Sequence, residues 1–164
     1  HIFITYKPEI DQHICAYQKL RYTPCVLEFS YVERKSERNR AADITEIKQI
    51  KKQARTVIPQ RVEFWANKIG VTYGRIAIRL QSSRWGSCSV DGNLNFNCLL
   101  VIMPPEIMDS VVVHELCHRR HMNHSKDFYA EIDRVFPDYK RCNKWLKDNG
   151  GVYLKRVSLV GTIV

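Results

Sequence analysis

Apolar residues recur at steps of three and four between residues 43 and 70, which is the spacing of one face of an α-helix. One long helix is therefore predicted there, with Pro59 as a place where it could bend. Its opposite face is expected to be basic through five side chains: Lys48, Lys51, Lys52, Arg55 and Arg61.

Alternating apolar and polar residues at 76–80 and 94–99 predict two short strands. Between them lies a polar turn at 82–89, with the sequence S-S-R-W-G-S-C-S, and then an Asp91-Gly92 turn signal. The two strands are expected to pair as a hairpin.

Helical spacing returns after Pro104-Pro105, again from Ser125 to Val135, and in a short segment at 139–147. The glycines at 150 and 151 are expected to end the last helix. These patterns predict an α+β fold divided into a divergent N-terminal segment (1–42), a central domain (43–150) and an extended C-terminal tail (151–164).

Composition restricts the partners and the compartment. A formal charge of +9 on 164 residues suits nucleotides, nucleic acid or acidic peptides, although a solvated basic surface explains it equally well. Six cysteines without a C-x-x-C pair or a secretory signal predict free thiols in the reducing cytoplasm. No apolar run approaches the roughly 20 residues of a membrane span.

The strongest chemical signal is V-V-V-H-E-L-C-H at 111–118, an H-E-x-x-H motif entered from an apolar run. On a helix, His114 and His118 lie on one face, so both imidazoles can bind one Zn²⁺. Glu115 would then take a proton from a zinc-bound water. A buried His pair is unfavourable unless something binds it, which favours a metal site over a chance motif.

A catalytic zinc needs a third protein ligand. His121 would lie about 10.5 Å from His114 along a continuous helix, which is too far, so it is expected to be solvated or to support a ligand. His124 can be brought back if the chain turns near Asn123 and Ser125 caps the next helix. The preferred third ligand is therefore His124, and Glu131 on the following helix is the rival.

Five ordered segments carry a family resemblance. They are S-S-R-W-G-S-C-S (82–89), G-N-L-N-F-N-C-L-L (92–100), V-V-V-H-E-L-C-H (111–118), M-N-H-S-K-D-F-Y (122–129) and P-D-Y-K-R-C-N-K-W-L-K (137–147). This series, within residues 54–150, closely resembles the YgjP-like metallopeptidases, a zincin-type family related in outline to the SprT-like proteases.

The resemblance implies a small zincin-like domain with a long N-terminal helix, a short antiparallel or mixed sheet and an H-E-x-x-H helix. It also implies one Zn²⁺ per chain, with His114, His118 and His124 as ligands and Glu115 as the catalytic base. The expected activity is hydrolysis of a peptide or protein substrate. The alternatives are a nucleotide (NTP) pyrophosphatase on the same site and a SprT-like nucleic-acid-associated protease module.

Further site residues are expected around the predicted sheet. Arg84 can hold a substrate anion or stabilise a developing oxyanion, because guanidinium offers a planar fork of donors. The strand at 94–99 is expected to pair with an extended peptide, as zincin edge strands do, with Asn95 and Asn97 contacting it. Cys88 can approach the metal, but a buried thiol is the preferred interpretation.

Overall fold

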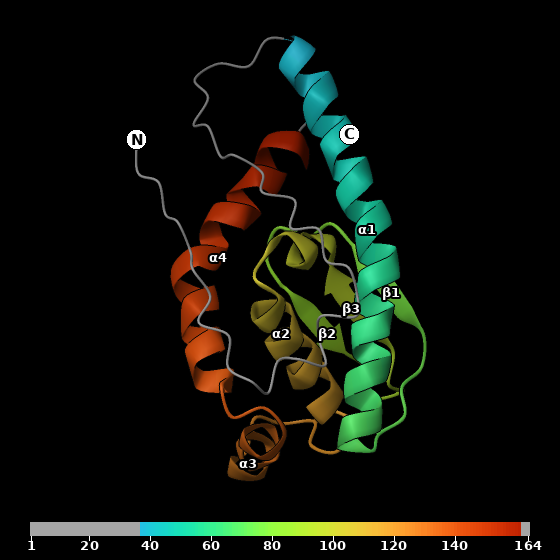
Figure 1. Ribbon diagram of the computed structural model, residues 1–164, viewed down its shortest axis with the longest axis vertical. Helices are drawn as coiled ribbons and strands as arrows, with labels where there is room; N and C mark the ends of the chain where they lie inside the picture. Colours follow the sequence, from blue (N-terminus) through green and yellow to red (C-terminus); the bar gives the residue numbers. More distant parts are fainter. Residues whose placement is uncertain (1–36, 162–164) are drawn as a thin grey trace, which may run out of the picture. The chain divides into compact units, whose positions relative to one another are not determined.

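The computed structural model describes the backbone of residues 37–161 and the side chains of residues 44–155. The elements follow one another as α1 (Glu37–Ile69), β1 (Ile76–Arg79), β2 (Gly86–Cys88), β3 (Leu94–Asn97), the 3₁₀ helix η3 (Cys98–Ile102), α2 (Pro105–Cys117), α3 (Lys126–Val135) and α4 (Tyr139–Gly161) (Figure 1). This is the predicted α+β arrangement with a long first helix. Most of the predicted segment 1–42 lies outside the described residues.

Helix α1 begins at Glu37, before the predicted start, and Pro59 lies inside it without ending it. Its apolar stripe is buried as expected, through Ile50, Ala54, Ile58, Val62, Trp65, Ala66 and Ile69. This stripe packs on η3 and on α2. The long helix therefore supports the helix that carries the H-E-x-x-H motif.

The prediction that Arg61 belongs to the exposed basic face of α1 is wrong. Its guanidinium donates from Nε and Nη2 to the two carboxylate oxygens of Asp109, each at 2.8 Å. The two side chains are only 8% and 4% exposed. A buried bidentate pair of this kind fixes both partners, so it ties α1 to the first half of α2.

The sheet has the strand order β1-β3-β2, with β1 parallel to β3 and β2 antiparallel to it. The prediction that the strands at 76–80 and 94–99 form a hairpin is therefore wrong. The hairpin joins β2 to β3 through a turn in which Gly92 has φ 83°, a conformation that favours glycine. β2 comes from the stretch predicted to be a polar turn.

Helix α2 contacts α1, η3, β2, α3 and α4, and in Figure 1 it lies between α1 and α4. Ten of its residues between Ile107 and Cys117 are buried, on every side of the helix. A helix that is buried all round is held by its neighbours on several faces. The side chains at its C-terminal end are therefore held in place by the surrounding packing.

The predicted extended tail is also wrong, because α4 continues through Gly150 and Gly151 to Gly161. A glycine lowers helix propensity by only about 1 kcal/mol, and packing can exceed that. Tyr153, beyond the two glycines, packs against the core and against Trp145. Of the helices described, none is both long and apolar enough to cross a lipid bilayer.

Candidate active site

Three histidines converge where α2 ends and α3 begins. His114 lies in the last turn of α2, His118 is the C-cap residue of that helix, and His124 lies in the turn before α3. One nitrogen from each ring lies within 4.8 Å of the others, and the Nε2 atoms of His114 and His124 are 3.0 Å apart. The three predicted ligands are therefore brought together.

The turn that returns His124 to the cluster is set by the local sequence. α2 stops at Cys117, and Ser125 caps α3 by accepting a hydrogen bond from the backbone N–H of Phe128. Without this break the helix would carry His124 away from the other two histidines. The predicted Ser125 cap is confirmed, whereas the helix ends at Cys117 and thus before the predicted turn near Asn123.

The cluster fits a zinc ion in its donor type, and its three ring nitrogens, all within 4.8 Å of one another, are close enough to approach one ion. Tetrahedral Zn–N bonds of about 2.0–2.1 Å place ligand nitrogens about 3.3 Å apart, close to the 3.0 Å between the Nε2 atoms of His114 and His124. Three imidazoles leave a fourth position open, which is the pattern of a catalytic zinc site. These residues are the ones that could hold such an ion.

Hydrogen bonds orient two of the rings. Nδ1 of His118 lies 3.0 Å from the backbone carbonyl of His121, which can only accept, so this nitrogen carries the proton and leaves Nε2 free. Nδ1 of His114 lies 2.8 Å from the hydroxyl of Tyr139 on α4. Partners on the non-ligating nitrogen are typical of metal-binding histidines. His121 thus supports a ligand through its backbone, as one of the two predictions for it allowed.

The surroundings also favour the neutral, metal-binding form of two histidines. Burial, together with the smaller effects of positive charge on His118 and His124, lowers the pKa of His114 to about 4. The pKa of His118 is likewise lowered, mainly by burial. Both rings are therefore neutral near pH 7, with a lone pair available.

Phe128 forms the apolar floor of the cluster. Its ring is buried on α3, with its centroid 4.9 Å from the His114 ring, 4.6 Å from His118 and 4.9 Å from His124. Because this one ring touches all three imidazoles, it restricts how far any of them can move. The sequence alone did not predict this contact between Phe128 and the three histidines.

Glu115 lies beside this cluster and is only 6% exposed. Its side chain runs along the backbone of Gly86 in β2, so closely that a Cβ there would lie 2.6 Å from Oε1. Burial raises the pKa of Glu115 to about 8, and the positive charge of Arg84 opposes that rise. Gly86, predicted only as a turn residue, is the surface on which the carboxylate rests.

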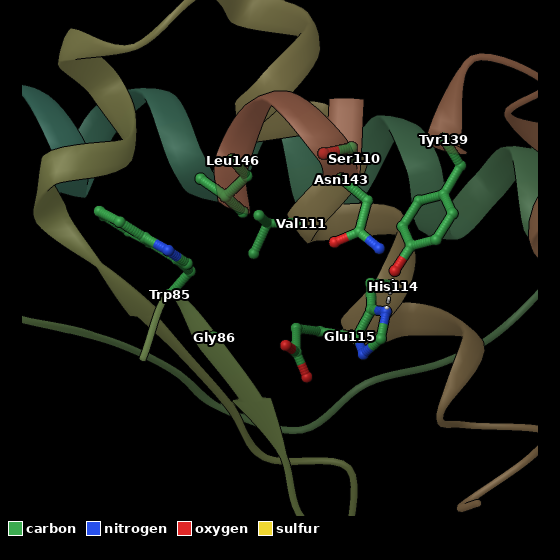
Figure 2. A pocket seen from close by; sticks show the side chains of 9 residues that line it. All are labelled: Trp85, Gly86, Ser110, Val111, His114, Glu115, Tyr139, Asn143 and Leu146. Atoms are coloured by element: carbon green, nitrogen blue, oxygen red, sulfur yellow. Dashed lines mark hydrogen bonds between the residues drawn. The ribbon is translucent and has the colours of Figure 1, made fainter. Parts of the chain in front are cut away.

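A pocket of about 190 Å³ opens next to Glu115 and His114. Figure 2 shows that side chains from α2 and α4 meet there with the stretch at Trp85 and Gly86. Its lining residues are Trp85, Gly86, Ser110, Val111, His114, Glu115, Tyr139, Asn143 and Leu146. Glu115 and His114 thus face a space that a substrate group can enter.

The other predicted site residues divide into two groups. Arg84 is exposed and acts on Glu115 through its charge, so its predicted role stays open. Asn95 is half-buried and donates from Nδ2 to the hydroxyl of Ser87 at 3.3 Å, and its substrate contact also stays a prediction.

Neither Glu131 nor Cys88 belongs to the histidine cluster. Glu131 instead pairs with Arg120 and Arg134.

Asn97 does not fit the predicted contact with substrate. Its side chain is fully buried, donates to the carbonyls of Gln81 and Arg84, and accepts from the N–H of Leu99. It therefore holds the loop that precedes β2. The related prediction that β3 is an edge strand open to a peptide is wrong, because β3 has a neighbour on each side.

Tyr139, Asn143 and Leu146 were not predicted as site residues. All three lie on α4, well beyond the H-E-x-x-H motif in the chain, and they reach the site only because α4 packs on α2. Their spacing of three and four residues marks one face of a helix, but such a face is more often core than binding site. The sequence alone therefore carried no specific signal for them.

The site and fold can be compared with known proteins. No curated protein matches the chain. The solved structure of the metallopeptidase zymogen of Pyrococcus abyssi abylysin is similar in fold, with a TM-score of 0.51 and 20% sequence identity over 57% of this chain and 96% of that chain. The sequence matches the family described as YgjP-like, metallopeptidase domain, over residues 6–149. Since this match spans most of the sequence, the chain belongs to the YgjP-like metallopeptidase-domain family.

Proposed function

We propose that the chain is a zinc-dependent metallopeptidase in which Glu115 is the general base. The observation that carries this proposal is the convergence of His114, His118 and His124 on one point, with the Glu115 carboxylate in the adjoining pocket. Three imidazole ligands, an open position and a neighbouring carboxylate are the parts that zinc-assisted hydrolysis requires.

Bound zinc would supply a Lewis acid that polarises the scissile carbonyl and lowers the pKa of a water molecule. Glu115 takes the proton from the water that attacks the carbonyl carbon and passes it to the departing amine. The burial that raises its pKa makes it a stronger proton acceptor, whereas the charge of Arg84 moderates the effect. Arg84 is proposed to face the oxygen on which negative charge develops.

A peptide suits this pocket better than a nucleotide does. A triphosphate would need several Lys and Arg side chains converging on the metal, yet neither residue type is among the nine that line the pocket, and Arg84 is the one cation whose charge acts on Glu115 among the described residues. The lining combines apolar side chains with Ser110, Asn143 and Tyr139, which matches the mixed character of a peptide. Peptide or protein is therefore the proposed substrate class.

The proposed compartment is the reducing cytoplasm. The four cysteines among the described residues are free thiols: Cys88, Cys98, Cys117 and Cys142. Burial raises the pKa of Cys98 to about 11 and that of Cys117 to about 12, which makes both poor nucleophiles. Inert free thiols are what a protein of a reducing compartment carries.

The test is zinc-dependent peptide cleavage by the full chain. A mixture of synthetic peptides is incubated with the zinc-loaded protein, with Glu115→Gln and with chelator-treated protein, and the products are identified by mass spectrometry. We expect cleavage by the wild type alone, restored after chelation by added zinc. Equal cleavage by Glu115→Gln would contradict the role of the base. Hydrolysis of nucleoside triphosphates without peptide cleavage would contradict the substrate class.

A further inference from the structure

The pocket beside Glu115 has two unlike ends. Trp85, Val111 and Leu146 gather at one end, whereas Glu115 and His114 lie at the other, as Figure 2 shows. The apolar end is built from three separate parts of the chain: the residue before β2, the middle of α2 and the middle of α4. A group that fills it lies close to the reacting centre.

We propose that this apolar end receives one large apolar side chain of the substrate, of the Leu, Met or Phe type, from a residue that flanks the scissile bond. We further assign Asn143, which lies near His114 and Tyr139 in Figure 2, to a hydrogen bond with the substrate backbone. The inference rests on the proposed peptidase function and names the substrate class of that site.

The size and chemistry of the pocket support an apolar occupant. A cavity of roughly 150 Å³ lined by aliphatic and aromatic side chains holds a benzene ring, and this pocket measures about 190 Å³. Val111 and Leu146 offer no partner for a charged group and Trp85 offers only its neutral indole N–H, so a charge buried here would be poorly compensated. Acidic side chains are opposed further by the carboxylate of Glu115.

Close packing fixes the wall formed by Trp85. Gly150 on α4 approaches this ring so closely that a Cβ there would lie 3.0 Å from Cζ2. Trp85 and Leu146 also pack against the hydrophobic core. The Trp85 ring is therefore held against α4.

The amide of Asn143 is suited to a peptide group. Among the described residues its side chain has no hydrogen-bond partner, and it is only partly buried. A carboxamide donates and accepts, as a backbone peptide group does, so the two can pair. Ser110, by contrast, already donates its hydroxyl to the carbonyl of Ile107 at 2.7 Å.

The first experiment is a cleavage profile of the zinc-loaded full chain on a peptide library. We expect Leu, Met and Phe to be enriched at one position next to the cleaved bond, with kcat/KM at least about 10-fold higher for Leu than for Ala there. Cleavage with no preference, or with a preference for charged residues, would overturn the inference while leaving the peptidase function intact.

Two matched pairs of variants test whether the pocket residues cause the preference for apolar substrate residues. Leu146→Trp fills the apolar end and should shift the preference to Ala and Gly, whereas Val152→Trp adds the same bulk at an exposed position of α4 and should not. Asn143→Ala should lower kcat/KM about 10-fold, and Asn149→Ala, which loses only a bond to the carbonyl of Trp145, should not. An unchanged preference in a folded Leu146→Trp would overturn the inference.

A binding measurement tests the proposed side-chain pocket independently of peptide cleavage. Addition of N-acetyl-leucine amide should shift the NMR signal of the Trp85 indole N–H in the wild type and not in Leu146→Trp. N-acetyl-aspartate amide should leave this signal unchanged in both. Binding without peptide cleavage would contradict the proposed function alone, whereas cleavage without binding of the leucine probe would contradict the pocket assignment.

Discussion

The contact between Gly86 and Glu115 leads to the sharpest prediction. In Gly86→Ala the new Cβ would lie 2.6 Å from Oε1, 2.7 Å from Cγ and 2.9 Å from Cδ of Glu115. Ordinary contacts between such atoms begin near 3.5 Å, so the carboxylate must move by about 1 Å. Gly86 is not among the glycines with positive φ, so the backbone itself accepts alanine.

The expected result is a large loss of activity with the metal retained. A misplacement of about 1 Å in a catalytic group can lower the rate about 10²-fold, and Glu115, being 6% exposed, has little space into which it can turn. The overpacking should also lower the free energy of unfolding by about 1–3 kcal/mol. The three histidines are untouched, so zinc binding should persist.

The assay is kcat/KM for a cleaved peptide, measured together with zinc content and urea unfolding. Gly151→Ala is the matched control, because nothing lies within 4 Å of a Cβ at that helical position. It should keep wild-type activity and be slightly more stable, by up to about 1 kcal/mol. Wild-type activity in a folded Gly86→Ala would refute the claim that this contact positions the base.

Three further predictions test the support of the site. Tyr139→Phe removes the hydrogen-bond partner of His114 Nδ1 and should weaken zinc binding about 10- to 100-fold. Zinc affinity is measured by competition with a chelator, and an unchanged affinity would contradict the proposed support of His114 by Tyr139. The pKa of Glu115 is raised to about 8, so the metal-free wild type should lose stability relative to Glu115→Gln as the pH rises from about 4 to 8. The expected change in the difference between their free energies of unfolding is about 3–5 kcal/mol. A difference that does not change with pH would contradict the burial of the Glu115 charge. Arg61→Ala should lower the free energy of unfolding by about 3–5 kcal/mol, because the buried carboxylate of Asp109 loses both hydrogen bonds from the guanidinium, and a loss below about 1 kcal/mol would contradict this.

Local sequence was sufficient to predict which three histidines come together. His114 and His118 follow from helical spacing, and the cap at Ser125 indicated where the helix must break to return His124. These features depend on residues close together in the chain. The long helix α1 was predictable for the same reason, because its apolar stripe repeats over many turns.

The incorrect predictions concern contacts between segments that are far apart in the sequence. β2 contains only Gly86–Cys88 in a polar stretch, so neither alternation nor propensity marked it as the hairpin partner of β3. Arg61 was placed on the outer face of α1 because its partner, Asp109, lies 48 positions away. The roles of Gly86 and Tyr139 likewise arise only when β2 and α4 pack against α2. None of these contacts leaves a periodic pattern in the sequence.

The most direct test of the central claim is the metal content of protein purified without a histidine tag and then offered zinc. We expect about one zinc per chain in the wild type and in Glu115→Gln, and a large loss in His124→Ala. That result would identify His124 as the third ligand and leave Glu115 free to act as the base. Zinc bound equally well by His124→Ala, or not bound by the wild type, would contradict the three-histidine site.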